Sequence, residues 1–329
     1  MKPRVEVIAL GGTIASKPRP GQDGVFPDLT AEDIISAAPA ISQVADVGAR
    51  TYAAVPSVEI DIPMMRRIIA LMTDLEAKGV SGFIITQGTD TIEETAYVFD
   101  LLWGGQSPVI VTGAMRNAAQ PGADGAANIL AAIVCAADPL LQDAGVLVVM
   151  DDKIHAAAWV QKGDTSNVSA FTSPAPVGWI AEGKPALYAK PVRQRQIGLP
   201  ADAGIPFVPI LKPGLGDPPL LIQAALDLGA EGIVADLSGG GHGAVAWADA
   251  LETAATTVPV VFSSRTRGGR VLSNTYGQLG AEIDLIRRGL VPSRDLDALK
   301  ARLLLSLLLM ADAVEQFEQH AILSWRNMP

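Results

Sequence analysis

Short apolar runs rich in β-branched residues alternate with longer segments of helical period through the first half of the chain. The apolar runs cover residues 5–10, 82–86, 109–112 and 145–150, and the helical segments cover 63–78, 92–103 and 124–137. This alternation predicts an α/β domain built on a parallel sheet with helices on both faces. Ligands of such sheets bind beyond the carboxyl ends of the strands. The residues that follow each predicted strand are therefore the candidates for chemistry.

A second, smaller alternation begins after a proline-rich segment. Prolines crowd residues 191–219 without a helical period, which predicts a linker over 191–206. Beyond it, strands are expected at 207–211, 232–237 and 258–263, and helices at 220–228, 244–255 and 294–316. The sequence thus predicts a larger N-terminal domain (1–190), a linker (191–206) and a smaller C-terminal α/β domain (207–329).

Composition and charge exclude several classes of partner. With 329 residues, 49% of them apolar and 18% charged, the chain can fill the cores of two globular domains. A formal charge of −10 opposes attraction to phosphate backbones, so we expect a small-molecule ligand and no nucleic acid. No run approaches the roughly 18 apolar residues of a membrane span, so no membrane association is expected.

The cysteine usage and the first residues bear on the compartment. The single Cys135 lies in an alanine-rich helical segment and is expected to be buried. One cysteine cannot close an intrachain disulfide, which favours a reducing compartment. The opening apolar run contains Glu6 and ends at a glycine turn, which indicates a strand and not a secretory signal. We therefore expect a soluble, cytoplasmic protein.

The first predicted strand ends in LGGTIAS, residues 10–16. Gly11 and Gly12 let the backbone turn sharply and approach a ligand, and Thr13 then presents a hydroxyl beside free backbone donors. The spacing does not match the G-x-G-x-x-G pattern of dinucleotide-binding turns. A plain glycine turn with an incidental threonine is the alternative for this stretch taken alone.

The next two strand ends carry similar small and polar residues. Residues 87–91 read QGTDT, in which Gly88 permits close approach, Thr89 offers a hydroxyl and Asp90 a carboxylate. Capping of the following helix by Asp90 or Thr91 is the alternative there, although it leaves residues 87–89 unexplained. The third strand ends in TGA, with Ala114 last. Three such ends in succession favour a shared binding pocket.

A threonine nucleophile requires a base. None of the chain's three histidines, His155, His242 and His320, lies in a nucleophile-elbow or metal-binding pattern, and His242 is expected to be a turn residue. Lys162, in the polar stretch WVQKGDTSNVSAF, can draw a proton from a threonine if the fold holds the two together. A solvated loop lysine is the alternative interpretation.

Several motifs together resemble the asparaginase/glutaminase family of the bacterial and archaeal kind. They are GGTIAS (11–16), TQGTDTIEETAY (86–97), VTGAMR (111–116), ADGAAN (123–128) and the stretch from GVLVVMDDKIHAA to VQKGDTSNVSAF (145–171). They occur in the family's order and span nearly the whole first domain, whereas the second domain is similar mainly in layout. The resemblance implies an L-asparaginase-type amidohydrolase, which releases ammonia from the side-chain amide of L-asparagine and leaves L-aspartate.

The resemblance also implies roles for individual residues. Thr13 matches the nucleophile that forms an acyl-enzyme, and Thr89 matches a second catalytic threonine that Lys162 and Asp90 activate. The implied substrate-binding residues are Ser57, Gly88, Thr89, Asp90 and Ala114. Of these, Ser57 holds the α-carboxylate, Asp90 also holds the α-ammonium, and the Ala114 backbone faces the scissile amide. No cofactor and no metal are implied. The family builds its site at a subunit interface, so we expect a homo-oligomer, either a dimer or a dimer of dimers.

The chain also departs from the family's pattern. The family usually has a tyrosine in the mobile loop after the first motif, whereas residues 17–30 contain none and offer Phe26 as a steric lid. This departure keeps two alternatives open: a glutaminase/asparaginase of broader specificity, and a non-catalytic amino-acid-binding homologue. A third alternative is the amidotransferase subunit that supplies ammonia to misacylated tRNA. That subunit calls for a basic surface and a further amino-terminal domain.

Overall fold

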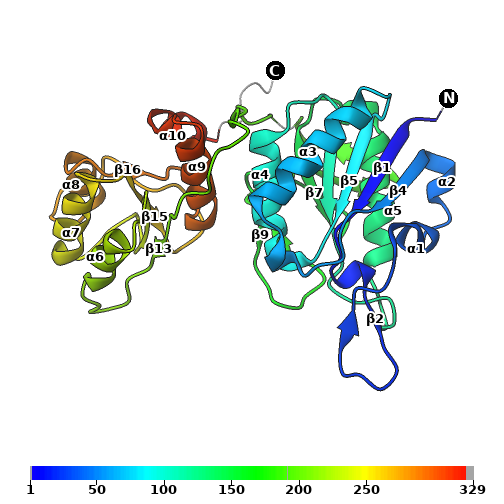
Figure 1. Ribbon diagram of the computed structural model, residues 1–329, viewed down its shortest axis with the longest axis horizontal. Coiled ribbons are helices and arrows are strands. Elements are labelled where there is room, and N and C mark those ends of the chain that lie inside the picture. The colour runs from blue at the N-terminus through cyan, green and yellow to red at the C-terminus, as the bar shows by residue number, and fades with distance from the viewer. Residues whose placement is uncertain (1, 191, 324–329) are drawn as a thin grey trace. The chain divides into compact units, whose positions relative to one another are not determined.

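The computed structural model describes residues 2–190 and 192–323, and contacts divide these residues into two units (Figure 1). The first unit runs to Gln196 and the second begins at Ile197, a division that falls within the segment 191–206 expected as a linker. Pro191, at the start of that segment, and residues 324–329, at the end of the expected C-terminal domain, lie outside the described residues. Each unit has its own sheet and hydrophobic core.

The described part of the first unit contains an eight-stranded sheet. From one edge to the other, its strands are β12 (Lys184–Leu187), β11 (Gly178–Ala181), β8 (Lys153–Ala156), β7 (Val146–Met150), β6 (Val109–Thr112), β5 (Gly82–Thr86), β1 (Arg4–Ala9) and β4 (Asp46–Thr51). The strands from β7 to β4 are parallel. The chain passes from β1 outward to β4 and returns on the other side of β1 as β5, so the strand order reverses there. Such a reversal opens a binding crevice at the carboxyl ends of the strands.

Helices cover both faces of this sheet (Figure 1). One face carries α1 (Ala31–Ser36), α2 (Ile41–Val44) and α5 (Gly125–Ala137), and the other carries α3 (Ile62–Glu76) and α4 (Ile92–Leu102). Successive residues of a strand point to opposite faces, so Val5, Val7 and Ala9 of β1 join the core under α5 while Ile8 is buried on the other side. Burial on both faces explains why the central strands are continuous apolar runs.

Short elements complete the described part of this unit. The 3-10 turns are η1 (Thr13–Ala15), η2 (Ser57–Glu59), η3 (Thr89–Thr91) and η4 (Pro139–Leu141), and two small hairpins pair β2 (Lys17–Pro18) with β3 (Val25–Phe26) and β9 (Gln161–Lys162) with β10 (Phe171–Thr172). The turns η1, η2 and η3 and the β9–β10 hairpin carry most of the candidate site residues, whereas Gly88 precedes η3 and Ala114 follows β6.

The α/β fold class and the predicted elements of the first unit are confirmed, although the sheet is mixed and not wholly parallel. β8, β11 and β12 are antiparallel strands at one edge. The sequence pattern missed them and β4 because they are short or half-exposed, and β4, β8 and β12 also contain charged residues. The buried Cys135 of α5 is confirmed, and burial raises the pKa of its thiol to about 12.

The second unit is a smaller α/β domain with a parallel sheet of order β13 (Ile210–Leu211), β14 (Ile233–Leu237), β15 (Val260–Ser264) and β16 (Val291–Pro292). Its helical elements are α6 (Leu220–Asp227), α7 (Val245–Ala255), α8 (Glu282–Arg287), α9 (Ala298–Met310), η5 (Val314–Gln316) and α10 (Phe317–Ala321). No helix among the described residues is long and apolar enough to cross a membrane.

The single long helix expected over 294–316 is wrong at both ends. The helix α9 begins after Asp297, whose side chain accepts a hydrogen bond from the Lys300 N–H at 3.0 Å and so caps the first turn. Arg294 precedes it with a left-handed φ of 56°, and Asp312 follows it with a φ of 51°. Left-handed backbone is incompatible with a continuing right-handed helix.

Candidate active site

The first strand end brings its threonine against the end of β5. Gly11 and Gly12 follow β1 with φ values of 111° and 80°, which side chains disfavour. A Cβ atom at Gly12 would lie 2.1 Å from the main-chain nitrogen of Gly88, so only glycine fits there. The segments that carry Thr13 and Thr89 are therefore in direct contact at the point where the strand order reverses.

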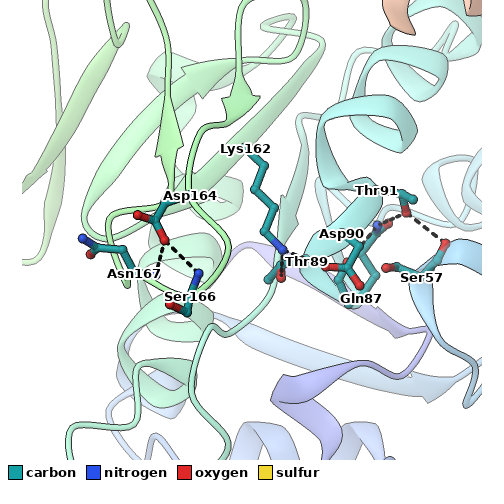
Figure 2. A network of polar contacts seen from close by, with 10 residues as sticks. Ser57, Gln87, Thr89, Asp90, Thr91, Lys162, Asp164, Ser166 and Asn167 are labelled. Atoms are coloured by element: carbon teal, nitrogen blue, oxygen red, sulfur yellow. Dashed lines mark hydrogen bonds and ion pairs between the residues drawn. The ribbon is translucent and has the colours of Figure 1, made fainter.

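Lys162 joins Thr89 and Asp90 in one polar cluster. The Lys162 ammonium donates hydrogen bonds to Thr89 Oγ1 at 3.0 Å and to Asp90 Oδ1 at 2.7 Å (Figure 2). We call these three residues the Thr89–Asp90–Lys162 cluster. Among the described residues, no hydrogen bond links the Thr13 hydroxyl to this cluster. The structure therefore joins three of the four expected catalytic residues directly. The fourth, Thr13, lies next to Gly12, whose main chain packs against Gly88.

The cluster lies partly in contact with solvent. Thr89 is 6% exposed and the Lys162 side chain 14%, whereas 69% of the Asp90 side chain is exposed. An open pocket of about 510 Å³ is lined by Asp90, Lys162 and residues 163–165. This arrangement leaves Asp90 oxygen surface for a cationic group of a small ligand.

The β9–β10 hairpin carries Lys162 to this place. Lys162 pairs with Phe171 of β10, which is buried at 2% exposure and anchors the hairpin. The following loop is closed by Asp164, whose carboxylate accepts hydrogen bonds from the N–H groups of Ser166 and Asn167 at 2.8 and 2.9 Å (Figure 2). These two bonds hold the pKa of Asp164 below its usual range.

Ser57 lies beside Gly88 on the other side of the cluster. Ser57 begins η2 and is buried, and its hydroxyl has no hydrogen-bond partner among the described residues. A Cβ atom at Gly88 would lie 3.0 Å from Ser57 Oγ, so the glycine keeps the two backbones close. Because buried hydroxyls in native proteins are usually paired, this one points to a ligand or water.

Thr91 contacts Ser57 and does not cap the helix. As the residue that precedes α4, it was one of the two expected caps, but it makes no side-chain cap bond. Its hydroxyl donates to the Ser57 carbonyl at 2.9 Å, while Asp90 is bound to Lys162 (Figure 2). The polar residues at this strand end therefore contact the site instead of completing the helix, and the capping alternative is wrong.

Ala114 follows β6 and is buried next to the same strand ends. A Cβ atom at the preceding Gly113 would lie 2.7 Å from the Gln87 carbonyl oxygen and 3.2 Å from Thr89 Cγ2. Asp124 and Asn128 of the α5 region hold this turn by hydrogen bonds. Sequence reasoning did not single out these two residues, although they lie in the ADGAAN motif.

The β2–β3 hairpin follows Thr13 directly. Arg19 forms a bidentate ion pair with Asp28, with Arg19 Nε 2.7 Å from Asp28 Oδ2, and its guanidinium lies 4.3 Å from the centre of the Phe26 ring. The Arg19 hydrogen bonds lower the pKa of the Asp28 carboxyl. Sequence reasoning singled out Phe26 alone, because nothing in the local pattern indicates that Arg19 folds over it.

These features define a class of protein: a two-domain α/β protein with a cluster of threonine, aspartate and lysine side chains at the carboxyl edge of its larger sheet. Comparison with known proteins agrees. The N-terminal asparaginase family model matches residues 4–193, and the glutaminase/asparaginase C-terminal domain model matches residues 208–319. The chain therefore belongs to the asparaginase family.

Individual relatives support the same assignment. The chain is 33% identical to the probable periplasmic L-asparaginase of Haemophilus influenzae and 34% identical to L-asparaginase 2 of Escherichia coli, with 93% of this chain aligned to 88% and 89% of theirs. It is also similar to the crystal structure of a probable cytoplasmic L-asparaginase from Campylobacter jejuni, with a TM-score of 0.86, 29% identity and coverage of 97% and 99%. Identity to a glutamyl-tRNA(Gln) amidotransferase component of Methanosarcina mazei is 28%, with 99% of this chain aligned to 78% of that protein. The chain is an asparaginase-type enzyme.

Proposed function

We propose that the chain hydrolyses the side-chain amide of L-asparagine through an acyl-enzyme on Thr13, assisted by the Thr89–Asp90–Lys162 cluster. In the first step the Thr13 oxygen bonds to the amide carbon, the carbon–nitrogen bond breaks, and the hydroxyl proton reaches the leaving nitrogen, which departs as ammonia. In the second step water attacks the ester, the bond to Thr13 breaks, and a water proton returns to the threonine.

The contact between Lys162 and Thr89 carries this proposal. A lysine that donates to a threonine oxygen leaves the hydroxyl hydrogen free for another acceptor, and a neutral lysine can accept that hydrogen. Asp90, at 2.7 Å, fixes the lysine in place. The pair can therefore move one proton to and from a reacting group, which supplies about 10²–10⁴-fold in comparable enzymes.

The neighbouring groups suit the other parts of an amino-acid substrate. The unpartnered Ser57 hydroxyl can donate to an α-carboxylate, and the exposed Asp90 carboxylate can accept from an α-ammonium. Main-chain N–H groups of Thr13 and Thr89 would stabilise the oxyanion, where such donors are worth about 3 kcal/mol each. A ligand with both charges and a short amide side chain satisfies all of these groups together.

Ammonia release from purified protein tests the proposal. L-asparagine, L-glutamine and their D-forms are offered separately, and L-asparagine is expected to give the highest kcat/KM. The Thr89→Val variant serves as the background because it keeps the side-chain shape but has no hydroxyl. Protein that releases no ammonia from any of the four amides would contradict the assignment and favour a binding function.

A broader glutaminase/asparaginase activity is the second candidate. It is favoured by Phe26, which closes the hairpin without a tyrosine hydroxyl that could select the substrate. Comparable kcat/KM values for L-glutamine and L-asparagine would support it. The tRNA-linked alternative is disfavoured because a net charge of −10 repels nucleic acid.

We also infer a homo-oligomer in the cytoplasm. Leu215, Leu220 and Leu221 are strongly exposed in the second unit and lie close together in sequence, and exposed large apolar side chains favour a protein contact. The solved relative is called cytoplasmic, whereas the Haemophilus relative is called periplasmic. Sedimentation of the purified chain and fractionation of its native cells test the two inferences separately: a monomer would contradict the first, and recovery outside the cytoplasm the second.

A further inference from the structure

Asp124 occupies the cap position of α5 but does not cap that helix. Its carboxylate instead accepts hydrogen bonds from the N–H groups of Met115 at 2.9 Å and Arg116 at 2.8 Å. Both residues lie in the turn after β6, immediately behind Ala114. A carboxylate that a helix would ordinarily use at its own end is therefore used to hold the turn that carries Ala114.

Asn128, one turn further along α5, holds the same turn from its other side. Its side-chain Nδ2 donates to the Gly113 carbonyl at 3.1 Å and to Asp124 Oδ2 at 3.0 Å, and its Oδ1 accepts from the Asp151 N–H at 3.1 Å. The carboxylate of Asp124 fixes which end of the amide is nitrogen, because only an N–H can face it. Asn128 is fully buried, and it ties the ends of β6 and β7 to α5.

These bonds set the direction of the Ala114 main chain. No cis peptide bond occurs among the described residues, and in a trans peptide the C=O and N–H groups point opposite ways. The Gly113 carbonyl points to Asn128, so the Ala114 N–H of that peptide points away from α5. The Met115 N–H points to Asp124, so the Ala114 carbonyl points away from α5 too. Gly113 packs against Thr89, which places this turn at the site.

We propose that Asn128 is a positioning residue of the amidase reaction, which aims the Ala114 main chain at the substrate amide. The inference rests on the proposed function. Among the described residues, no hydrogen bond joins Asn128 to the Thr89–Asp90–Lys162 cluster, so Asn128 acts through the Gly113 carbonyl. A neutral amide is needed because this position must donate to two oxygens and also accept from Asp151, and a carboxylate of the same shape can only accept.

The Asn128→Asp variant tests this role because it keeps the side-chain shape and the acceptor for Asp151. It sets a carboxylate oxygen against the Gly113 carbonyl and against Asp124, so the turn is expected to rotate. We expect kcat for L-asparagine to fall about 100-fold, as misplacement of a reacting group by about 1 Å does elsewhere. Asn128→Ala is the second variant should the first fail to fold, and Asn117→Ala is the matched control: a buried asparagine in the same loop with only local hydrogen bonds.

Binding of L-aspartate separates positioning from general damage. This product has no amide nitrogen for the Ala114 carbonyl to hold, so its inhibition constant is expected to stay within about twofold while kcat falls. Loss of L-aspartate binding in parallel with kcat would overturn the positioning role in favour of a structural one. Turnover by Asn128→Asp at the level of the Asn117→Ala control would overturn it as well. Ammonia release by the unchanged chain tests the proposed function separately, because the inference concerns only the ratio of variant to unchanged chain.

Discussion

The two units each hold an acidic side chain close to a basic one, but they use it differently. In the first unit, Asp90 contacts Lys162 and remains 69% exposed. In the second unit, Glu282 is fully buried and lies 3.0 Å from the imidazole of His242. Both are ion-pair geometries, yet only the first leaves carboxylate oxygen available to a small molecule.

The Glu282 carboxylate is occupied by the protein itself. It accepts hydrogen bonds from the N–H groups of Thr275 at 2.7 Å and Tyr276 at 2.6 Å in addition to the contact with His242. Burial alone would raise the pKa of Glu282, but these donors outweigh it and hold the pKa below its usual 4.5. A carboxylate whose oxygens already accept hydrogen bonds from the protein stabilises a loop, and one with exposed oxygens can bind a ligand. His242, expected as a turn residue, does lie in a tight turn, bridged to Ser238.

Removal of the proposed proton-transfer groups of the first unit is expected to have the largest effect on turnover. Thr89→Val or Lys162→Met should lower kcat for ammonia release by about 10³-fold, because each removes one member of the proposed proton relay. Thermal unfolding should change little, since neither residue contributes to the main hydrophobic core. The matched control is Lys184→Met, which makes the same change on the exposed edge strand β12. Full turnover in either variant would contradict the proposed roles of Thr89 and Lys162.

Loss of the fully hydrogen-bonded Glu282 carboxylate is expected to lower the stability of the second unit. Glu282→Gln should lower the free energy of unfolding of the second unit by about 3 kcal/mol at pH 7, because a buried charge-assisted network loses its acceptor. The Glu282 pKa is lowered on folding, so its contribution is present above pH 4.5 and is lost as the pH falls through the folded-state value. Hydrogen exchange of residues 275–287 between pH 7 and 4 measures the pH dependence of this stability. Equal protection of variant and unchanged chain at pH 7 would mean that the network is dispensable.

The first unit contains a carboxyl group whose pKa is shifted in the opposite direction, upward. Asp100 of α4 is buried, and burial raises its pKa from 3.8 to about 7 although the N–H of Val146 and the charge of Arg193 oppose the shift. Because the pKa of Asp100 is higher in the folded state, its contribution to the free energy of unfolding is fully present when the pH is below the unfolded-state pKa of 3.8. This contribution is lost as the pH rises toward the folded-state pKa of about 7. Asp100→Asn keeps the acceptor for Val146 and should therefore stabilise the first unit by about 2 kcal/mol at pH 8. Exchange of residues 92–102 is the measurement, and no gain at pH 8 relative to pH 4 would contradict it.

Much of the first unit followed from the sequence because its central strands and helices are buried in regular periods. The last residues of β5 and β6 were predicted correctly, which placed Thr89 and Ala114 just beyond the carboxyl ends of these strands. Contacts between distant segments did not follow from any period. Lys162 and Asp90 are 72 residues apart, and their pairing was expected from family resemblance and not from spacing.

The remaining misses share one physical cause. The bonds from Asp124 and Asn128 to the turn at Gly113 depend on how α5 is placed against β6, which no local pattern encodes. The ion pair between Arg19 and Asp28 likewise depends on the hairpin that places the two residues together. Side chains of this kind look like ordinary solvated or capping residues until the fold assigns their partners.

The ion pair between Arg19 and Asp28 offers the test with the smallest expected effect. It is an exposed pair of the first unit, and it lies in the hairpin whose strand β3 contacts η1, the turn of Thr13. Surface pairs contribute little and are screened by salt, so Arg19→Met should raise KM for L-asparagine only about twofold to fivefold. The KM of the unchanged chain should rise with added salt toward the variant's value, whereas the variant should respond little. Arg19→Lys keeps the charge but cannot form the bidentate pair, so it should fall between the two. A KM that is indifferent to salt in all three would mean that packing of Phe26 alone sets the hairpin, and that exposed charges of the first unit matter only where they reach the reacting groups.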